Sequence, residues 1–161
     1  MRRSLRERDS SSAPACAALE KWLHAHPGLR TIASYSPLPG EVDLAAVVRG
    51  RPDLNWVYPK VIGQHLTFHP GANLTAGSFG ILEPTDRSPE VPLQRIDAFI
   101  CPGLAFDKSG GRLGRGRGFY DRLLAQARPD ALKIGICFPE QLVPDTFPEA
   151  HDIPMDEVIH S

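Results

Sequence analysis

Short apolar segments of strand character alternate with helical segments along this chain, and this alternation limits the possible fold more than any other feature. The strand-like segments, rich in β-branched or aromatic residues, are 31–35, 55–59, 64–69, 79–82, 95–101, 132–138 and 157–160. Helical spacing of apolar residues predicts helices over 15–25, 42–49 and 119–128, the first capped by Ser12 with Pro14 just inside its start. Such alternation is typical of an α/β sandwich with a mainly parallel sheet, in which ligands bind at the carboxyl ends of the strands. We therefore expect the site on the loops after Tyr35, Cys101 and Phe138.

The composition is that of one globular domain without a strong overall charge. A length of 161 residues, 42% of them hydrophobic, suffices for a single core, so we expect one domain over residues 1–161. The 18 Lys and Arg against 19 Asp and Glu leave a formal net charge of -1, which gives no overall field to attract a nucleic acid. Three cysteines without a C-x-x-C motif indicate neither a zinc ribbon nor a disulfide framework, and no apolar run approaches the ~18 residues that span a bilayer. We expect a monomeric, cytoplasmic protein that binds neither nucleic acid nor membrane.

The segment from Gly110 to Arg122, GGRLGRGRGFYDR, is the densest chemical signal in the sequence. Glycines allow backbone N–H groups to converge on a ligand, and arginine side chains bind phosphate through paired hydrogen bonds. The segment also leads into the N-terminus of the predicted third helix, which favours anions. Its spacing matches neither the P-loop nor the dinucleotide fingerprint. A phosphate-binding loop is favoured over two alternatives, a solvated flexible loop and an RNA-binding patch.

The same segment, with the one before it, resembles the signature of the 5-formyltetrahydrofolate cyclo-ligase family. The resemblance rests on PGLAFD at 102–107 and GRLGRGRGFYDR at 111–122. Further similar pieces occur in the family's order: RRSLR at 2–6, PGEV at 39–42, ILEP at 81–84 and HDIPMDEV at 151–158. The resemblance implies a three-layer α/β sandwich with a mainly parallel sheet, similar to the sugar-phosphate isomerase and CoA-transferase type. It also implies that ATP and Mg²⁺ are used to close 5-formyltetrahydrofolate into 5,10-methenyltetrahydrofolate.

By the same resemblance, two overlapping sets of residues bind the small-molecule ligands. The ATP-binding residues are Arg2, Arg6, Arg112, Leu113, Gly114, Arg115, Gly116, Arg117, Gly118, Phe119 and Tyr120. The folate-binding residues are Glu41, Phe79, Arg115, Gly116, Arg117, Gly118 and Phe119. Arg115, Arg117 and Tyr120 are the expected catalytic residues. Without the resemblance, the sequence favours Glu41 beside a helix N-cap and Arg2 and Arg6 as ordinary surface residues, and a core position for Phe79 is as compatible as a ligand contact.

The resemblance assigns the magnesium ion to Asp121 and Asp152. Mg²⁺ often takes only one or two carboxylates and completes its octahedron with water and phosphate oxygens. Each acid also has a purely structural interpretation: Asp121 as a first-turn acid of a helix, and Asp152 as the cap of a turn. Asp107 is either an outer ligand or a loop anchor, and the i,i+4 pair His65 and His69 lacks a third ligand for a metal site.

Two positions depart from the family pattern, because Arg2 replaces the usual Lys and Phe119 replaces the first Tyr of G-Y-Y-D. Arginine cannot present the compact ammonium of lysine, and phenylalanine keeps the stacking surface but loses a hydroxyl. Two other functions stay open at this stage. One is a non-catalytic folate or nucleotide binder on the same scaffold, and the other is an RNA-binding protein that uses residues 112–122.

Overall fold

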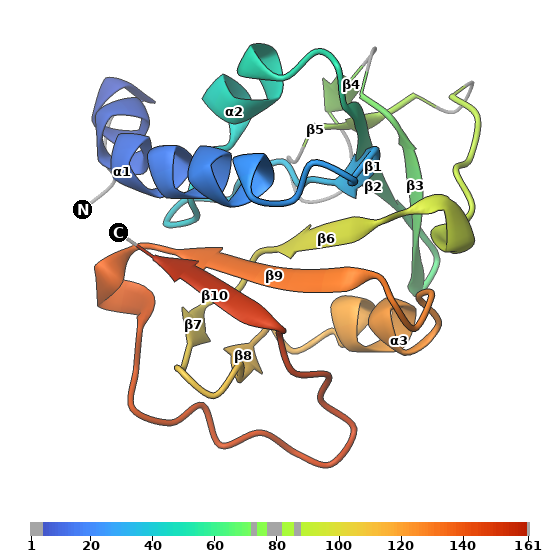
Figure 1. Cartoon of the computed structure of the whole chain (residues 1–161). Helices are drawn as coiled ribbons and strands as arrows, with labels where there is room; N and C mark the ends of the chain where they lie inside the picture. Colours follow the sequence, from blue (N-terminus) through green and yellow to red (C-terminus); the bar gives the residue numbers. More distant parts are fainter. Residues whose placement is uncertain (1–4, 72–73, 77–81, 86–87, 161) are drawn as a thin grey trace.

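A six-stranded sheet forms the centre of the molecule in the computed structural model, which describes residues 5–71, 74–76, 82–85 and 88–160 (Figure 1). The strands follow the order β10-β9-β6-β1-β2-β3. Their bounds are β1 Thr31–Ala33, β2 Asn55–Ile62, β3 His65–Pro70, β6 Ala98–Cys101, β9 Leu132–Cys137 and β10 Glu157–His160. All neighbours are parallel except β2 and β3, which form an antiparallel hairpin. The predicted α/β fold with a mainly parallel sheet is confirmed.

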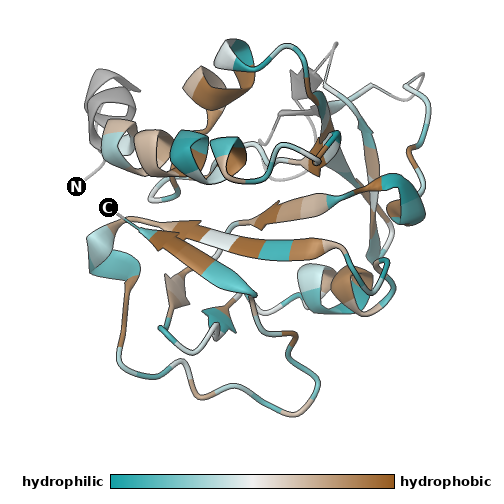
Figure 2. Cartoon of the chain, in the orientation of Figure 1, coloured by the Kyte–Doolittle hydropathy of each residue, from teal (hydrophilic) through white to brown (hydrophobic). Residues whose placement is uncertain are grey.

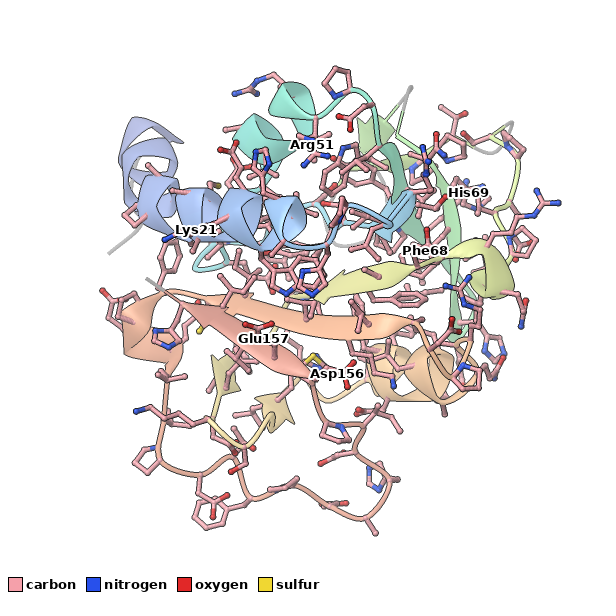
Figure 3. All side chains as sticks on the ribbon, viewed as in Figure 1. Lys21, Arg51, Phe68, His69, Asp156 and Glu157 are labelled. Carbon is pink, nitrogen blue, oxygen red and sulfur yellow. The ribbon has the colours of Figure 1, made fainter. Side chains whose placement is uncertain are left out.

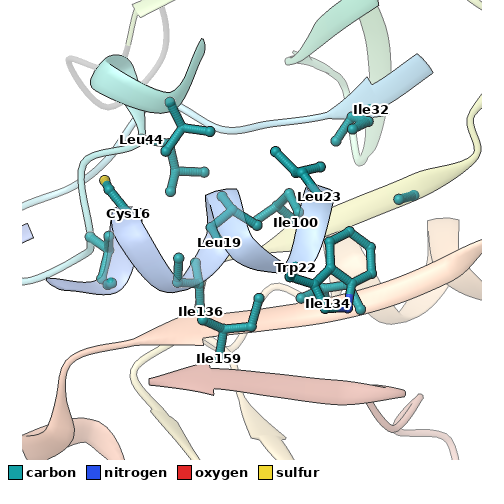
Figure 4. Packing of buried hydrophobic residues seen from close by; sticks show 14 of the residues in the cluster. Cys16, Leu19, Trp22, Leu23, Ile32, Leu44, Ile100, Ile134, Ile136 and Ile159 are labelled. Carbon is teal, nitrogen blue, oxygen red and sulfur yellow. The ribbon is translucent and has the colours of Figure 1, made fainter. Parts of the chain in front are cut away.

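Two layers cover the faces of this sheet, and the period-2 alternation of the strands supplies both with apolar side chains. Helices α1 (Leu5–His24) and α2 (Ala45–Gly50) cover one face, where Ile32, Ile100 and Ile134 pack beneath Leu19 and Trp22 (Figure 4). Helix α3 (Phe119–Ala125) and the hairpin β7 (Ala105–Phe106) to β8 (Arg112–Leu113) cover the other. Because both faces are buried, β6 and β9 are hydrophobic along most of their length (Figure 2).

The remaining elements are short and peripheral. They are the antiparallel pair β4 (Leu74–Ala76) and β5 (Leu82–Pro84) and the 3₁₀ turns η2 (Leu93–Arg95) and η3 (Pro139–Gln141). The connection from β9 to β10 runs as a long irregular segment along the side of the molecule that holds β7 and β8 (Figure 1). Within the described residues, no helix has the length and apolarity needed to cross a bilayer.

The helix boundaries differ from the sequence-based prediction because tertiary contacts decide them. Helix α1 starts at Leu5 and contains Pro14 in its interior, so Ser12 is not its cap; the Asp43 N–H donates to Ser12 Oγ at 3.0 Å and joins α1 to the loop before α2. Helix α2 begins three residues after the predicted Val42, because the Val42 carbonyl accepts the Tyr35 hydroxyl at 2.7 Å. The Asp43 carboxylate instead accepts the Ala45 N–H.

Candidate functional site

A cavity of ≈ 620 Å³ lies among the loops that follow the parallel strands. Its walls come from five parts of the chain: the loop after β1, the strands β2 and β3, the start of the loop after β6, the segment from β8 into α3, and the β9–β10 connection. The lining residues are Tyr35, Ser36, Leu38, Glu41, Pro59, Val61, Leu66, Pro102, Gly103, residues 112–121, Thr146, Phe147, Glu149, His151 and Asp152. The loops after Tyr35 and Cys101 therefore meet as expected, and the third expected loop, after Phe138, contributes its distal part.

The Gly/Arg segment crosses the middle of this lining as a bent loop between β8 and α3. Gly116 and Gly118 have φ values of 89° and 67°, which side-chain-bearing residues rarely adopt, so glycine is required for these two bends. The bends place Arg115 and Arg117 on the cavity wall. Helix α3 then begins at Phe119 and ends at Ala125, three residues before the predicted end, and the Arg128 side chain forms ion pairs with Asp97 and Asp130.

Arg112 is turned into the protein, with its side chain only 6% exposed. Its Nη1 donates to the Pro102 carbonyl at 3.0 Å, and its guanidinium carbon lies 5.3 Å from the centre of the Tyr120 ring. Its Nη2 is 3.9 Å from Asp121 Oδ1, and its buried Nε has no hydrogen-bond partner among the described residues. Arg112 thus contributes a fixed positive charge behind the loop.

Glu41 lines the cavity with a side chain only 5% exposed. Its Oε1 accepts the Leu38 N–H at 2.8 Å, and its Oε2 lies 3.4 Å from Arg115 Nη2. Burial raises the pKa of the Glu41 carboxyl above its usual value, although the Leu38 N–H and the Arg115 guanidinium both act to lower it. The carboxylate is therefore short of polar partners, which favours a ligand with N–H donors.

Tyr120 follows the loop in the first turn of α3 and also faces the cavity. Burial raises the pKa of its hydroxyl, and the neighbouring Cys101 and Glu41 act in the same direction. The hydroxyl is therefore protonated at neutral pH and is able to donate a hydrogen bond.

Asp121 and Asp152 line the same cavity although they are far apart in the sequence. Asp121 Oδ1 accepts the N–H of Ile153, the residue next to Asp152, at 3.1 Å, which joins α3 to the β9–β10 connection. Asp152 Oδ2 accepts the Glu149 N–H at 2.7 Å, and its Oδ1 is 3.3 Å from His151 Nε2. Two neighbouring carboxylates beside a cavity suit Mg²⁺, which needs few protein ligands.

The described residues contain no group of three or more His, Cys, Asp or Glu side chains arranged to hold a metal. His65 and His69 lie on β3 (Figure 3 labels His69), and neither lines the cavity that Asp121 and Asp152 share. His69 Nε2 is 2.7 Å from Thr67 Oγ1, and its Nδ1 is 3.0 Å from the Ser88 carbonyl. His69 therefore has structural partners.

Asp107 anchors two loops of the site with one buried carboxylate. Oδ1 accepts the N–H groups of Ser109 and Gly111, each at 2.9 Å. Oδ2 accepts the Thr146 N–H at 3.0 Å and the Thr146 hydroxyl at 2.8 Å. Burial opposes ionisation of Asp107, but these hydrogen bonds outweigh it and lower the pKa. Of its two expected roles, the contacts of Asp107 are those of the loop anchor.

Substituting Asp107→Asn should destabilise the protein by about 2–4 kcal/mol, because an amide NH₂ then faces N–H or O–H donors that lose their acceptor. Urea unfolding monitored by circular dichroism measures this loss. The carboxylate's contribution is present at neutral pH and is lost as the pH falls through its lowered pKa, so the difference between the two proteins should shrink in acid. Asp53→Asn, at an exposed carboxylate, is the control and should change stability little. Equal effects of the two substitutions would contradict the anchoring role.

The structure brings most of the predicted site residues to one cavity. Glu41, every residue from Arg112 to Asp121, and Asp152 line it together. Arg2, Phe79 and the Arg6 side chain lie outside the described residues. The sequence analysis missed Thr146 and Phe147, whose irregular, proline-rich segment carries no periodic signal, and the β2–β3 wall formed by Pro59, Val61 and Leu66.

Comparisons with known proteins identify the family of this chain. A family model described as the 5-formyltetrahydrofolate cyclo-ligase family matches residues 53–161. A Mycolicibacterium smegmatis 5-formyltetrahydrofolate cyclo-ligase is 40% identical over 57% of this chain and 47% of its own length. A Schizosaccharomyces pombe protein named as a probable 5-formyltetrahydrofolate cyclo-ligase is 34% identical over 63% of this chain and 55% of its own length. The matched region thus spans about half the length of these two relatives.

A solved structure extends the likeness to nearly the whole chain. The NMR structure of Aquifex aeolicus 5,10-methenyltetrahydrofolate synthetase superposes with a TM-score of 0.83 at 33% sequence identity, and the match covers 98% of this chain and 81% of that one. The order of the sheet, the loop that precedes α3 and the family match lead to the same assignment: the chain belongs to the 5-formyltetrahydrofolate cyclo-ligase family.

Proposed function

We propose that this protein uses ATP and Mg²⁺ to convert 5-formyltetrahydrofolate into 5,10-methenyltetrahydrofolate, with release of ADP and phosphate. The observation that carries the proposal is the meeting of three chemical functions at one cavity: the Glu41 carboxylate, the Arg115 and Arg117 loop, and the acids Asp121 and Asp152. Membership of the family supports the reaction class. The volume of ≈ 620 Å³ is in the range of small-molecule sites.

The chemistry of the substrate explains why a phosphate-binding loop is needed. A formyl amide is a poor electrophile because its nitrogen lone pair is delocalised into the carbonyl. In the proposed reaction, the formyl oxygen attacks the terminal phosphorus of ATP, and the bond from that phosphorus to ADP breaks. The 10-nitrogen of the folate then attacks the activated formyl carbon and loses its proton. Departure of phosphate from that carbon completes the cyclic amidinium product.

Each part of the cavity has a distinct task in this proposal. Glu41 accepts paired hydrogen bonds from the amino and ring N–H groups of the pterin and so fixes the formyl group. Arg115 and Arg117 neutralise charge on the phosphoryl group as it is transferred. The protonated Tyr120 hydroxyl donates a hydrogen bond to an anionic oxygen. Asp121 and Asp152 would hold Mg²⁺, which neutralises the charge of nucleotide phosphate oxygens when bound.

The direct test mixes the protein with 5-formyltetrahydrofolate and Mg-ATP and follows the near-ultraviolet absorbance band of the methenyl product. Absorbance should rise with time and should not rise when the nucleotide is omitted. Binding of both ligands without a rise in absorbance would indicate a non-catalytic binder instead. The RNA-binding alternative is disfavoured by the inward position of Arg112 and by the ion pair of Arg115 with Glu41. A salt-dependent RNA shift without ATP turnover would restore it.

Asp152→Asn should raise the Mg²⁺ concentration needed for half-maximal turnover by about 10- to 100-fold, because one of the two proposed carboxylate ligands loses its charge. The asparagine carbonyl still accepts the Glu149 N–H, so the loop is expected to keep its shape. A Mg²⁺ titration of the initial rate at saturating ATP and folate measures the shift. Asp130→Asn, at an exposed acid outside the cavity, should leave the titration unchanged; the same midpoint in both variants would remove Asp152 from the metal site.

A further inference from the structure

Phe147 combines an exposed aromatic ring with an unfavourable backbone conformation. Its side chain is 81% exposed, although it lines the cavity. Its φ of 51° makes it the non-glycine residue with positive φ among the described residues. Pro148 follows directly, and residues that precede a proline prefer extended backbone. The chain therefore holds a large apolar ring in water, in a conformation that its sequence disfavours.

Neighbouring hydrogen bonds hold this conformation in place. Thr146 is bound through both its N–H and its hydroxyl to Asp107 Oδ2. The Phe147 N–H donates to Asp145 Oδ1 at 2.7 Å. The backbone at Phe147 is thus held by the carboxylates of Asp107 and Asp145. Strained residues that their surroundings fix in this way are concentrated at ligand-binding sites.

A second exposed apolar side chain lines the same cavity as Phe147. Among the described residues, the exposed large hydrophobic side chains are Ile62, Leu104, Leu113 and Phe147. Leu113 and Phe147 both line the cavity, whereas Ile62 and Leu104 do not. A flat aromatic side chain at a cavity mouth fits a planar ring of a ligand, because offset stacking buries the apolar faces of both rings.

We propose that Phe147 stacks against the purine base of the nucleotide, an inference that rests on the proposed function. The pterin is assigned to Glu41, whose part of the lining continues into Pro59 and Val61 of β2. Figure 1 shows the β9–β10 connection, which carries Phe147, running below the β7–β8 hairpin, whereas β2 and β3 lie above the hairpin and to its right. The transferred phosphoryl group must lie between its donor and its acceptor at the Gly/Arg loop. The nucleoside therefore occupies the side of Phe147.

Three variants and two probes test this contact by isothermal titration calorimetry with Mg²⁺ present. Phe147→Ala should weaken ADP binding about tenfold, because base–aromatic stacking is lost, and should leave inorganic pyrophosphate binding unchanged, because that probe has no base. Phe147→Trp should restore ADP affinity. Ile62→Ala, which removes another exposed apolar side chain, one outside the cavity, should change neither affinity.

Thermal stability provides a second readout. If Phe147 only supported the fold, replacing it would lower the melting temperature. Phe147→Gly should raise the melting temperature, because glycine adopts a φ of 51° without strain, while it weakens ADP binding as much as Phe147→Ala does. The inference fails if wild type binds ADP and the Ala variant binds it equally well, or if the loss falls on 5-formyltetrahydrofolate instead. If wild type binds neither ADP nor folate, the proposed function itself fails.

Discussion

Replacement of Arg117 by Ala is expected to lower kcat by about 100- to 1000-fold while the Kd for 5-formyltetrahydrofolate changes much less. Arg117 lies on the cavity wall beside the two glycine bends, where its guanidinium can follow charge that develops on the phosphoryl group. Preorganised donors aimed at such charge act mainly in the transition state, so their loss appears in kcat. Stopped-flow absorbance of the methenyl product gives kcat, and equilibrium titration gives the folate Kd.

Two further variants make this result specific. Arg117→Lys keeps the charge but loses the paired hydrogen bonds, so it should recover only part of the rate. Arg49→Ala removes an exposed arginine of α2 outside the cavity and should leave kcat within about twofold of wild type. If Arg117→Ala weakens folate binding while kcat stays unchanged, Arg117 binds the substrate in its ground state and does not assist phosphoryl transfer.

Glu41→Gln is expected to weaken 5-formyltetrahydrofolate binding by about 10- to 100-fold, because the pterin N–H groups lose hydrogen bonds to a charged acceptor. ATP binding should change little, because the proposed phosphate contacts come from the Gly/Arg loop. Fluorescence or calorimetric titration with each ligand separately measures the two effects. Similar losses for both ligands would mean that Glu41 shapes the whole cavity and does not recognise the pterin.

Although Glu41→Gln should weaken folate binding, it should not lower the stability of the protein. The sign of the stability change follows from the raised pKa of Glu41. An acid whose pKa is higher in the folded state favours folding below its unfolded pKa and loses that contribution as the pH rises through its folded value. At neutral pH the buried carboxylate is thus a cost, so Glu41→Gln should melt at the same or a higher temperature than wild type. The advantage of the variant should disappear at a pH below the unfolded pKa of glutamate. A lower melting temperature at neutral pH would contradict this assignment.

The sheet could be predicted from the sequence because burial on both faces leaves a strong local signal. Residues 98–101 and 132–137 are apolar along almost their whole length. Each segment forms a strand whose ends lie within three residues of the predicted ones. Helix boundaries were less predictable. Ser12 and Pro14 indicate a helix start by local rules, but Ser12 binds Asp43 from another segment, and no local pattern reports that contact.

The candidate site was predictable where backbone chemistry demands particular residues. Glycines at Gly116 and Gly118 are needed for the bends, so the loop is visible as a motif in the sequence. The β9–β10 connection is different, because its conformation depends on Asp107, 39 residues before Thr146. Nothing in the residues around Phe147 predicts that its ring stays in solvent. The pairing of Arg115 with Glu41 across 74 residues was likewise beyond local reasoning.

The carboxylate of Asp107 joins the start of the Gly/Arg segment, through Gly111, to the tip of the β9–β10 connection, through Thr146. The positions of these two walls of the cavity therefore depend on each other, although the two segments are separate in the sequence. A loop exchanged between relatives of this protein to alter nucleotide preference would have to carry residues that match both ends of this linkage. Grafts that replace only one wall should produce folded proteins whose two ligand positions are out of alignment.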